Sequence, residues 1–252
     1  MRLRFSTLFV TAIVFAVASL SYSQEHREVP NKAATVTTRP SAITLRLGTS
    51  AVVIPAPVGY EEASSQFEGV KARFSETEAP GNEMLAVHLM SSDCDLLRSG
   101  QQATMQQYTK ISVLRTAKEL PFSQAELASV VAEFRKNGAS MLDPSGARMK
   151  ALLEHLEQGL KNTGSNASGV DMTQPVNMGE FEVSPNIYSV MLLLQFKSSA
   201  GQATPVLAGM SYMRVQQRLV YVFTYRKYTS RSDVETLRTF AKTWTANILA
   251  AN

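Results

Sequence analysis

The sequence has a single cysteine, Cys94, in 252 residues. An internal disulfide is therefore impossible, and the free energy of folding has to come from packing. No cysteine follows the apolar N-terminal run to accept a lipid, so we do not expect a lipoprotein. Asp93 and Asp95 flank the thiol and would raise its pKa, which disfavours the thiolate that a nucleophile needs. We interpret Cys94 as a small apolar residue at a helix start, rather than as a catalytic or redox cysteine.

The familiar catalytic motifs are also missing. There is no Gly-x-Ser-x-Gly, Walker loop, His-Glu-x-x-His or calcium loop. A zinc site needs about three converging protein ligands, and the three histidines, His26, His88 and His155, lie far apart. His88 with Asp93 and Asp95 is the one set close in sequence, and its spacing matches no recognised site. The sequence thus predicts no catalytic residue, no metal and no cofactor.

Basic residues are in only slight excess, with 25 Lys and Arg against 21 Asp and Glu, a formal net charge of +4. Arg2 and Arg4 belong to a leader that we expect to be removed, which leaves +2 on the rest of the chain. A nucleic-acid-binding protein would show basic clusters with interleaved aromatic residues, and none is visible. The sequence therefore predicts no nucleic-acid partner.

Long apolar runs are absent except at the N-terminus. Residues Leu8–Leu20 carry no charge, and Ser21-Tyr22-Ser23 places small residues at the two positions that a signal peptidase reads. We predict cleavage of a signal peptide, residues 1–23, between Ser23 and Gln24. The alternative is an uncleaved anchor, but a membrane span needs roughly 20 apolar residues, and the run is shorter. We expect an exported protein, periplasmic or secreted, with no membrane span in the mature chain.

The remaining chain divides into a tether and one domain. Residues 24–40 are polar, carry charges of both signs and lack apolar periodicity, which predicts a flexible tether. Residues 41–252 are interpreted as a single α+β domain. Alternation predicts strands at 43–47, 51–54, 84–90, 108–114, 179–183, 187–197, 206–215 and 219–227. Spacing of three and four residues predicts helices at 92–97, 124–137, 145–162 and 232–250.

Local signals refine three of these helices. Ser123 to Glu126 and Ser232 to Glu235 each fit a capping box, and Ser92 or Asp93 could cap the short helix. Strands come in hairpins and are separated by groups of helices, so the order is not a run of βαβ units. The predicted architecture is an antiparallel sheet covered by helices on two sides, an αβα sandwich.

The stretch 186–252 forms the spine of this prediction. If Gln216 and Gln217 make a two-residue loop, Tyr212 lies opposite Tyr221 and Met210 lies opposite Phe223. Both faces of the resulting hairpin are largely apolar, one aromatic and one aliphatic. A sheet with one wet face would alternate apolar and polar residues, so we expect cover on both sides.

A family resemblance rests on short motifs. The stretch Val53-Ile54-Pro55-Ala56-Pro57-Val58-Gly59-Tyr60 resembles the start of PsbP-like αβα sandwiches, a superfamily that includes an extrinsic photosystem II protein and a Ran-binding import factor. The strand Val220–Tyr225 and the helix end Trp244–Asn252 are similar to those of uncharacterised exported bacterial proteins of this shape. The resemblance implies the fold and the binding of partners without catalysis, and it carries over no functional residue.

Three functions follow as hypotheses. The leading one is a non-catalytic binding or adaptor module that contacts another protein of the bacterial envelope. The second is an unrecognised hydrolase or thiol enzyme with its site in a loop-lined cleft, for which Cys94 and His88 are the named candidates. The third is a carrier of a small apolar ligand between sheet and helix, where Tyr221 and Phe223 face. We expect any site to lie on loops 55–82, 91–104 or 163–178.

Overall fold

The computed structural model describes residues 42–164, 171–197 and 203–252. Its elements in chain order are β1 (Ala42–Leu47), β2 (Ser50–Pro55), β3 (Tyr60–Glu62), α1 (Glu68–Glu76), β4 (Asn82–Met90), α2 (Ser91–Arg98), β5 (Gln107–Leu114), α3 (Gln124–Met141), α4 (Ala147–Asn162), β6 (Asp171–Met172), β7 (Val176–Ser184), β8 (Ile187–Lys197), β9 (Ala203–Val215), β10 (Arg218–Lys227) and α5 (Ser232–Ala250). The predicted signal peptide, the tether and His26 lie outside the described residues.

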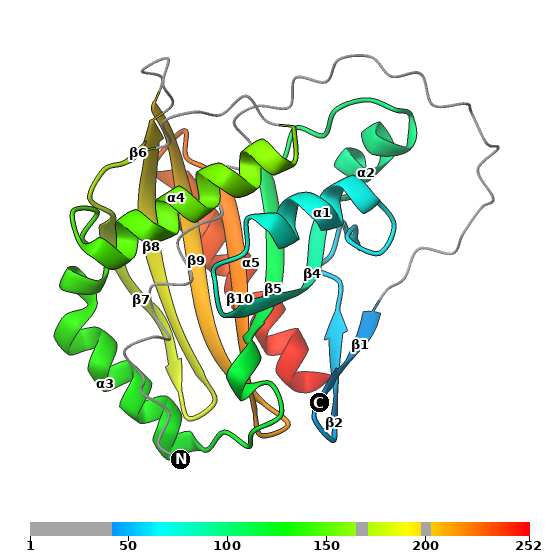
Figure 1. Cartoon of the computed structure of the whole chain (residues 1–252). Coiled ribbons are helices and arrows are strands. Elements are labelled where there is room, and N and C mark those ends of the chain that lie inside the picture. The colour runs from blue at the N-terminus through cyan, green and yellow to red at the C-terminus, as the bar shows by residue number, and fades with distance from the viewer. Residues whose placement is uncertain (1–41, 165–170, 198–202) are drawn as a thin grey trace.

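One large sheet organises the described part of the chain (Figure 1). Its strand order is β3-β4-β5-β10-β9-β8-β6, and β7 pairs with β8 beside β6. All of these pairings are antiparallel. β1 and β2 form a separate two-stranded antiparallel sheet, which lies beside the β4 end of the large one (Figure 1).

The predicted spine is confirmed. Gln216 and Gln217 have φ of 47° and 58°, so the turn takes the left-handed conformation that a two-residue hairpin loop requires, despite its unfavourable residues. Tyr212 pairs with Tyr221 and Met210 pairs with Phe223, in the expected register. The twist of the strands is compatible with this turn, and packing on both faces outweighs the weak turn preference of glutamine.

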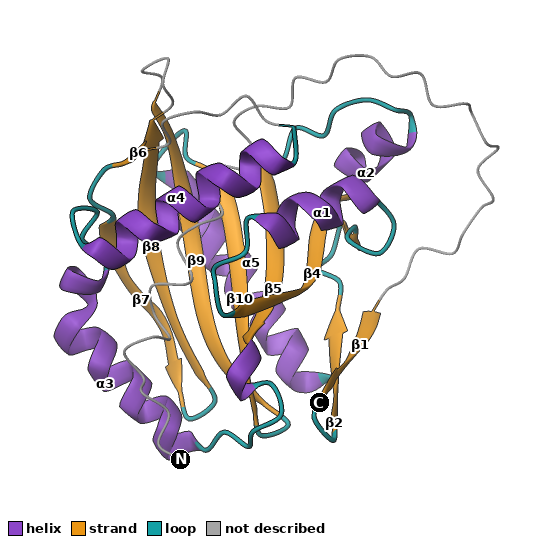
Figure 2. Cartoon of the chain, in the orientation of Figure 1, coloured by secondary structure: helices purple, strands orange, loops and turns teal. Residues whose placement is uncertain are grey.

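Helices cover both faces of the sheet, so the αβα prediction is confirmed (Figure 2). The aromatic face packs against α1, α3 and α4, which contribute Phe74, Phe134 and Leu156 among others. The aliphatic face packs against α5 through Trp244 and Ile248, and against the β1–β2 hairpin through Val52. Burying a side chain such as Trp244 contributes on the order of 2–3 kcal/mol.

The Ser123 capping box is confirmed: the Ser123 hydroxyl accepts from the Glu126 N–H, and the Glu126 carboxylate accepts from the Ser123 N–H at 2.7 Å. The helix that it starts runs on past Gly138 to Met141, because Leu142 is buried and continues the apolar stripe. The short strand β3 and the bounds of α1 were not foreseen, since that region has no clear periodicity.

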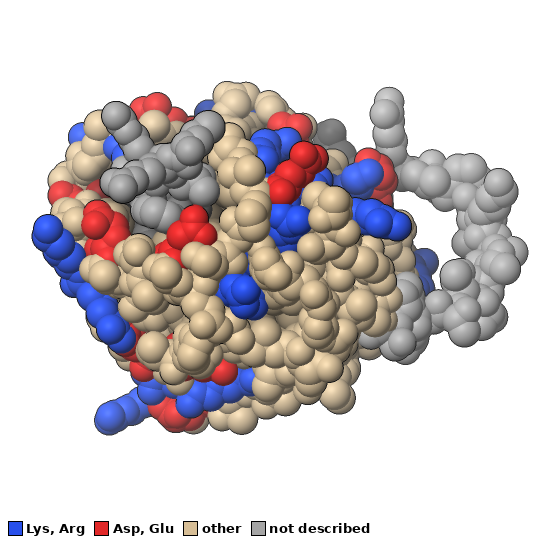
Figure 3. Space-filling view, turned by 90° about the horizontal axis from the view of Figure 1, so that it is seen from below, with Lys and Arg blue, Asp and Glu red and all other residues tan. Residues whose placement is uncertain are grey.

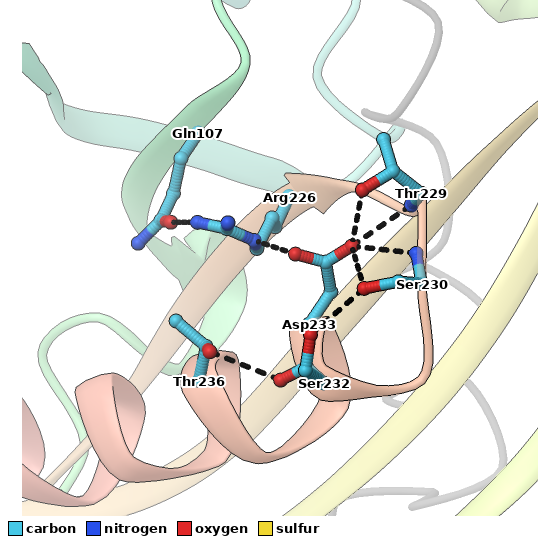
Figure 4. A network of polar contacts seen from close by, with 7 residues as sticks. All are labelled: Gln107, Arg226, Thr229, Ser230, Ser232, Asp233 and Thr236. Atoms are coloured by element: carbon cyan, nitrogen blue, oxygen red, sulfur yellow. Dashed lines mark hydrogen bonds and ion pairs between the residues drawn. The ribbon is translucent and has the colours of Figure 1, made fainter.

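The Ser232 capping box is wrong (Figure 4). The α5 N-terminus has no capping side chain. Asp233 turns its carboxylate back into the preceding loop, where Oδ2 accepts from the Thr229 N–H and hydroxyl at 2.9 and 2.7 Å. Arg226 donates to the other oxygen at 2.7 Å and also binds Gln107 of β5. These hydrogen bonds hold the pKa of Asp233 far below its usual range, and those from Thr229 have the largest effect. They also attach the start of α5 to β10 and β5.

The expected cap on the short helix α2 is wrong as well. No side chain caps α2. Asp93 instead accepts from the N–H and the hydroxyl of Thr104, at 2.8 and 2.9 Å, so its carboxylate stabilises the loop that returns to β5.

Candidate functional site

The surface most suited to contact a partner is built from two stretches without charge. Residues 47–60 and 243–252 contain no Lys, Arg, Asp or Glu. The first runs from the β1–β2 turn through β2 to β3, and the second is the end of α5. We call their exposed and half-buried residues the hairpin surface. Figure 3 shows a broad area free of charged residues on the side where β1 and β2 lie in Figure 1.

Special backbone positions shape this surface. Gly48 has φ of +58° at the β1–β2 turn, and Gly59 has φ of +80° in the loop between β2 and β3. Both are left-handed conformations that favour glycine. The Tyr60 N–H donates to the Pro57 carbonyl at 3.0 Å, which closes a tight turn and leaves Val58 at its tip. Val58 is 91% exposed, the most exposed of the large apolar residues that the structure describes.

Side chains in the last turns of α5 and just after its end join the two stretches. The Asn252 amide accepts from the Val53 N–H at 2.9 Å and donates to the Val53 carbonyl at 2.8 Å, so it pairs with β2 as a neighbouring strand would. Trp244 Nε1 donates to the Pro55 carbonyl at 2.8 Å. At the turn, Arg218 binds Thr49, Ser50 and the Glu119 carbonyl. The hairpin surface is therefore fixed to the core at three places.

A buried ion pair between Lys110 and Glu78 lies on the aromatic face of the sheet, away from the hairpin surface. Lys110 Nζ is 2.9 Å from Glu78 Oε2, and the Ser112 hydroxyl donates to the same oxygen at 2.7 Å. Lys110 also lies over the Phe223 ring, 4.8 Å from its centroid. Both charged side chains are almost completely buried, at 0% and 3% exposure. Burial lowers the pKa of Lys110 to about 8, against the opposing effect of Glu78.

Neighbouring groups close this centre from the helix side. The ring Nε2 of His155, on α4, donates to the Glu78 carbonyl at 2.8 Å. The Tyr108, Tyr221 and Tyr225 side chains are all buried on the same face, and burial raises the pKa of each well above its usual value. Lys110 and Ser112 of β5 and His155 of α4 all bind Glu78, so this arrangement links the sheet to α4.

Cys94 does not have the environment of a nucleophile. It is buried, and burial followed by the nearby Glu61 carboxylate raises the pKa of its thiol to about 12. The expected direction is confirmed, although burial rather than the flanking aspartates is the main cause. A thiol with this pKa carries almost no thiolate at neutral pH.

His88 is buried in β4 on the aliphatic face, under the Trp244 ring, whose centroid lies 5.4 Å away at an interplanar angle of 77°. Neither ring nitrogen has a hydrogen-bond partner among the described residues. His155 is on the opposite face, and Asp93 binds Thr104, so the structure does not bring the predicted polar candidates together. In the described part of the chain, no three or more His, Cys, Asp or Glu side chains gather as metal ligands would.

The two rings named for the apolar-ligand hypothesis are buried. Tyr221 and Phe223 are each about 1% exposed and packed by their neighbours. One described cavity of about 310 Å³ lies at the α3–α4 junction, and another of about 220 Å³ lies between α3 and the β7–β8 turn. Neither cavity borders these two rings.

The expected loops are only partly loops. Stretch 55–82 holds β3, α1 and the buried Glu78, while stretch 91–104 holds α2. Part of 163–178 lies outside the described residues. The hairpin surface overlaps the first of these stretches at 55–60, but sequence reasoning did not connect it with the end of α5. The signal that could have found it is the lack of charge shared by both stretches.

Comparison with known proteins gives little. No family model matches the chain, and no curated protein matches it. Among solved structures, the Saccharomyces cerevisiae Ran-binding protein Mog1p is similar over 85% of this chain and 95% of its own, with 12% identity and a TM-score of 0.33. A mutant of the protein Mog1 is similar over 83% and 94%, with the same identity and score. These scores are too low to support an argument about function.

None of the helices in the described part of the chain combines the length and the apolar character needed to cross a membrane.

Proposed function

We propose that this protein is an exported binding module that acts by contacting another protein of the cell envelope through the hairpin surface. The observation that carries the proposal is the joining of two charge-free stretches, 47–60 and 243–252, into one fixed surface. The cores of protein–protein interfaces are depleted in charged residues, because a buried charge loses its hydration. A surface held by three sets of hydrogen bonds also loses little conformational entropy when a partner covers it.

The alternative enzyme function has weaker support. Its two named candidates, Cys94 and His88, are both buried, on different elements and with different neighbours. Lys110 is buried against Glu78. The proposal therefore places function on the surface and gives the buried polar groups a structural role. The PsbP-like resemblance, with its partner binding without catalysis, forms part of the same proposal.

Export is the first part of the proposal to test. We expect the protein recovered from the periplasm or the medium to begin at Gln24, because a signal peptidase would cut after Ser23. Edman sequencing or intact-mass measurement of that protein gives its first residue directly. Recovery of the exported protein with Met1 still in place would contradict cleavage. Recovery of the protein only from the cytoplasm would contradict export.

Partner contact is tested by site-specific photo-crosslinking in living cells. Benzoylphenylalanine at Val58, in the hairpin surface, should give a discrete crosslinked species with a second protein. The same label at Val176, which is 52% exposed on β7 at the other side of the sheet, is the matched control and should not give this species. An excess of unlabelled protein should compete the Val58 species away. The same species from both positions, or none from Val58, would contradict the proposed surface.

A further inference from the structure

We infer that β1 is the pairing edge of a symmetric dimer, in which β1 of one copy adds antiparallel to β1 of a second copy about Thr44. This goes beyond the envelope contact proposed above and does not depend on it. The partner is a second copy of the same strand, Ala42–Leu47, with the sequence Ala-Ile-Thr-Leu-Arg-Leu. The edge of β1 is open among the described residues, whereas the edges at β7, β3 and β2 are short or protected.

The strand edges at β7, β3 and β2 are short or protected. On β7 the register shifts at two places, and the Arg238 guanidinium binds the Met178 carbonyl. Such bulges and covering charges are common ways to prevent strand addition. β3 has only three residues. The outer edge of β2 is occupied by the side chains of Asn252 and Trp244.

The β1–β2 register shows which backbone groups of β1 face outward. The pairing is unbroken from Ala42 with Pro55 to Leu47 with Ser50. In a hairpin with a two-residue loop, the pair that closes the loop is hydrogen-bonded and the pairs then alternate. Ile43, Leu45 and Leu47 therefore bond to β2. The N–H and C=O groups of the alternate residues, Thr44 and Arg46 among them, point to the free edge.

The β2 strand gives an independent check on this alternation. Val53 pairs with Thr44, and Pro55 pairs with Ala42, so both should turn their backbone groups away from β1. Both Val53 groups bind Asn252 and the Pro55 carbonyl binds Trp244, as the alternation requires. On β1, no described residue beyond β2 binds the corresponding groups. Among the described residues, β1 thus presents an exposed edge that no second strand covers.

The β1 sequence is complementary to itself in an antiparallel pairing centred on Thr44. Thr44 then faces Thr44 of the second copy, Ala42 faces Arg46, and Ile43 faces Leu45. Threonine pairs are favourable cross-strand neighbours, and the one charge, Arg46, never faces its own copy. Three outward pairs would give about six backbone hydrogen bonds. Ile43 and Leu45 are half-buried in the monomer and would be covered further.

The surroundings permit two copies to approach. Residues 47–60, which follow β1, carry no charge, so a two-fold contact there brings no like charges together. Figure 1 shows β1 on the outer side of β2, away from the large sheet and its helices. Pairing would join the two hairpins into one four-stranded sheet with β1 strands at its centre.

Sedimentation of the purified protein over a wide concentration range tests the inference. The wild type should shift from monomer to dimer as concentration rises. Thr44→Pro removes the outward N–H, while the β1–β2 ladder uses neither backbone group of Thr44, so dimerisation should weaken at least tenfold. Thr44→Ala keeps that N–H and should stay within about threefold of the wild type. An equal unfolding midpoint for both variants shows that the hairpin is intact.

A cysteine series keeps the test valid if the proline variant fails to fold. Thr44→Cys should be joined into dimers by a short bis-maleimide linker, because the two Thr44 positions lie across the two-fold axis. Ala51→Cys, exposed on β2 and away from that axis, should crosslink much less. Cys94 is buried, so it should not react with the linker. A monomer at every concentration, a dimer that Thr44→Pro does not weaken, or equal crosslinking from both positions would overturn the inference.

Discussion

Replacing Lys110 by methionine should lower the free energy of unfolding by about 3–5 kcal/mol, the usual cost of breaking a buried ion pair. The substitution keeps most of the side-chain volume, so the loss is electrostatic. Glu78 would keep its hydrogen bond from Ser112 but would lose the cation 2.9 Å away, inside a site with almost no access to water. Urea unfolding at neutral pH, where the Lys110 pKa of about 8 leaves the wild-type side chain charged, measures the change.

Two controls separate this electrostatic effect from general disruption. The double variant Lys110→Met with Glu78→Gln removes both charges and should recover most of the loss, because a neutral pair needs no compensation. Lys118→Met breaks a pair with Glu83 whose side chains are 29% and 32% exposed, and it should cost less than about 1 kcal/mol. A Lys110→Met cost as small as that of Lys118→Met would show that the buried pair adds little.

The Lys110–Glu78 pair also shows where sequence reasoning ends. The β5 strand was predicted from Tyr108, Ile111 and Val113, and its bounds were nearly right. Lys110 and Ser112 share a face with Tyr108, opposite Ile111 and Val113, and their partner Glu78 lies 32 and 34 residues away in a segment without periodicity. Alternation assigns residues to faces, but it does not show that a polar face will be covered.

The two capping motifs also show that contacts distant in the sequence can override a local pattern. Ser123 and Ser232 start two similar sequences, yet only the first forms a capping box. At the second, Arg226 and the N–H groups of Thr229 and Ser230 bind Asp233, and the box is not formed. The hairpin register at Gln216 and Gln217 was predictable because it is local, whereas the closing of β2 by Asn252 joins residues 199 positions apart.

His88 is a second buried titratable residue, and it lies on the aliphatic face of the sheet. Its cross-strand neighbours are Glu62 and Thr109, and Trp244 of α5 covers the ring. The Glu62 carboxylate is already engaged by the N–H groups and hydroxyls of Ser64 and Ser65. Glu62 favours the imidazolium only weakly, and burial dominates, so the pKa of His88 falls from 6.5 to about 4.

This shift gives a specific loss of stability in acid. Above pH 6.5 the imidazole is neutral in both states and contributes nothing to the pH dependence. As the pH falls below 6.5, the unfolded chain binds a proton that the folded protein does not bind until about pH 4. The free energy of unfolding should therefore fall between pH 6.5 and 4, by roughly 3 kcal/mol from this residue alone.

The matched comparison is His88→Leu, with urea unfolding measured in steps from pH 7 to 4. Leucine removes the titration and keeps an apolar contact with Trp244, so any difference in stability between the two proteins at pH 7 is a constant offset. Other carboxylates, including Asp233 with its lowered pKa, titrate equally in both and cancel in the difference. We expect the wild type to lose roughly 3 kcal/mol more than His88→Leu across this range. Parallel curves would mean that His88 is protonated in the folded protein as readily as in the unfolded chain, and that Trp244 and α5 do not exclude water from it.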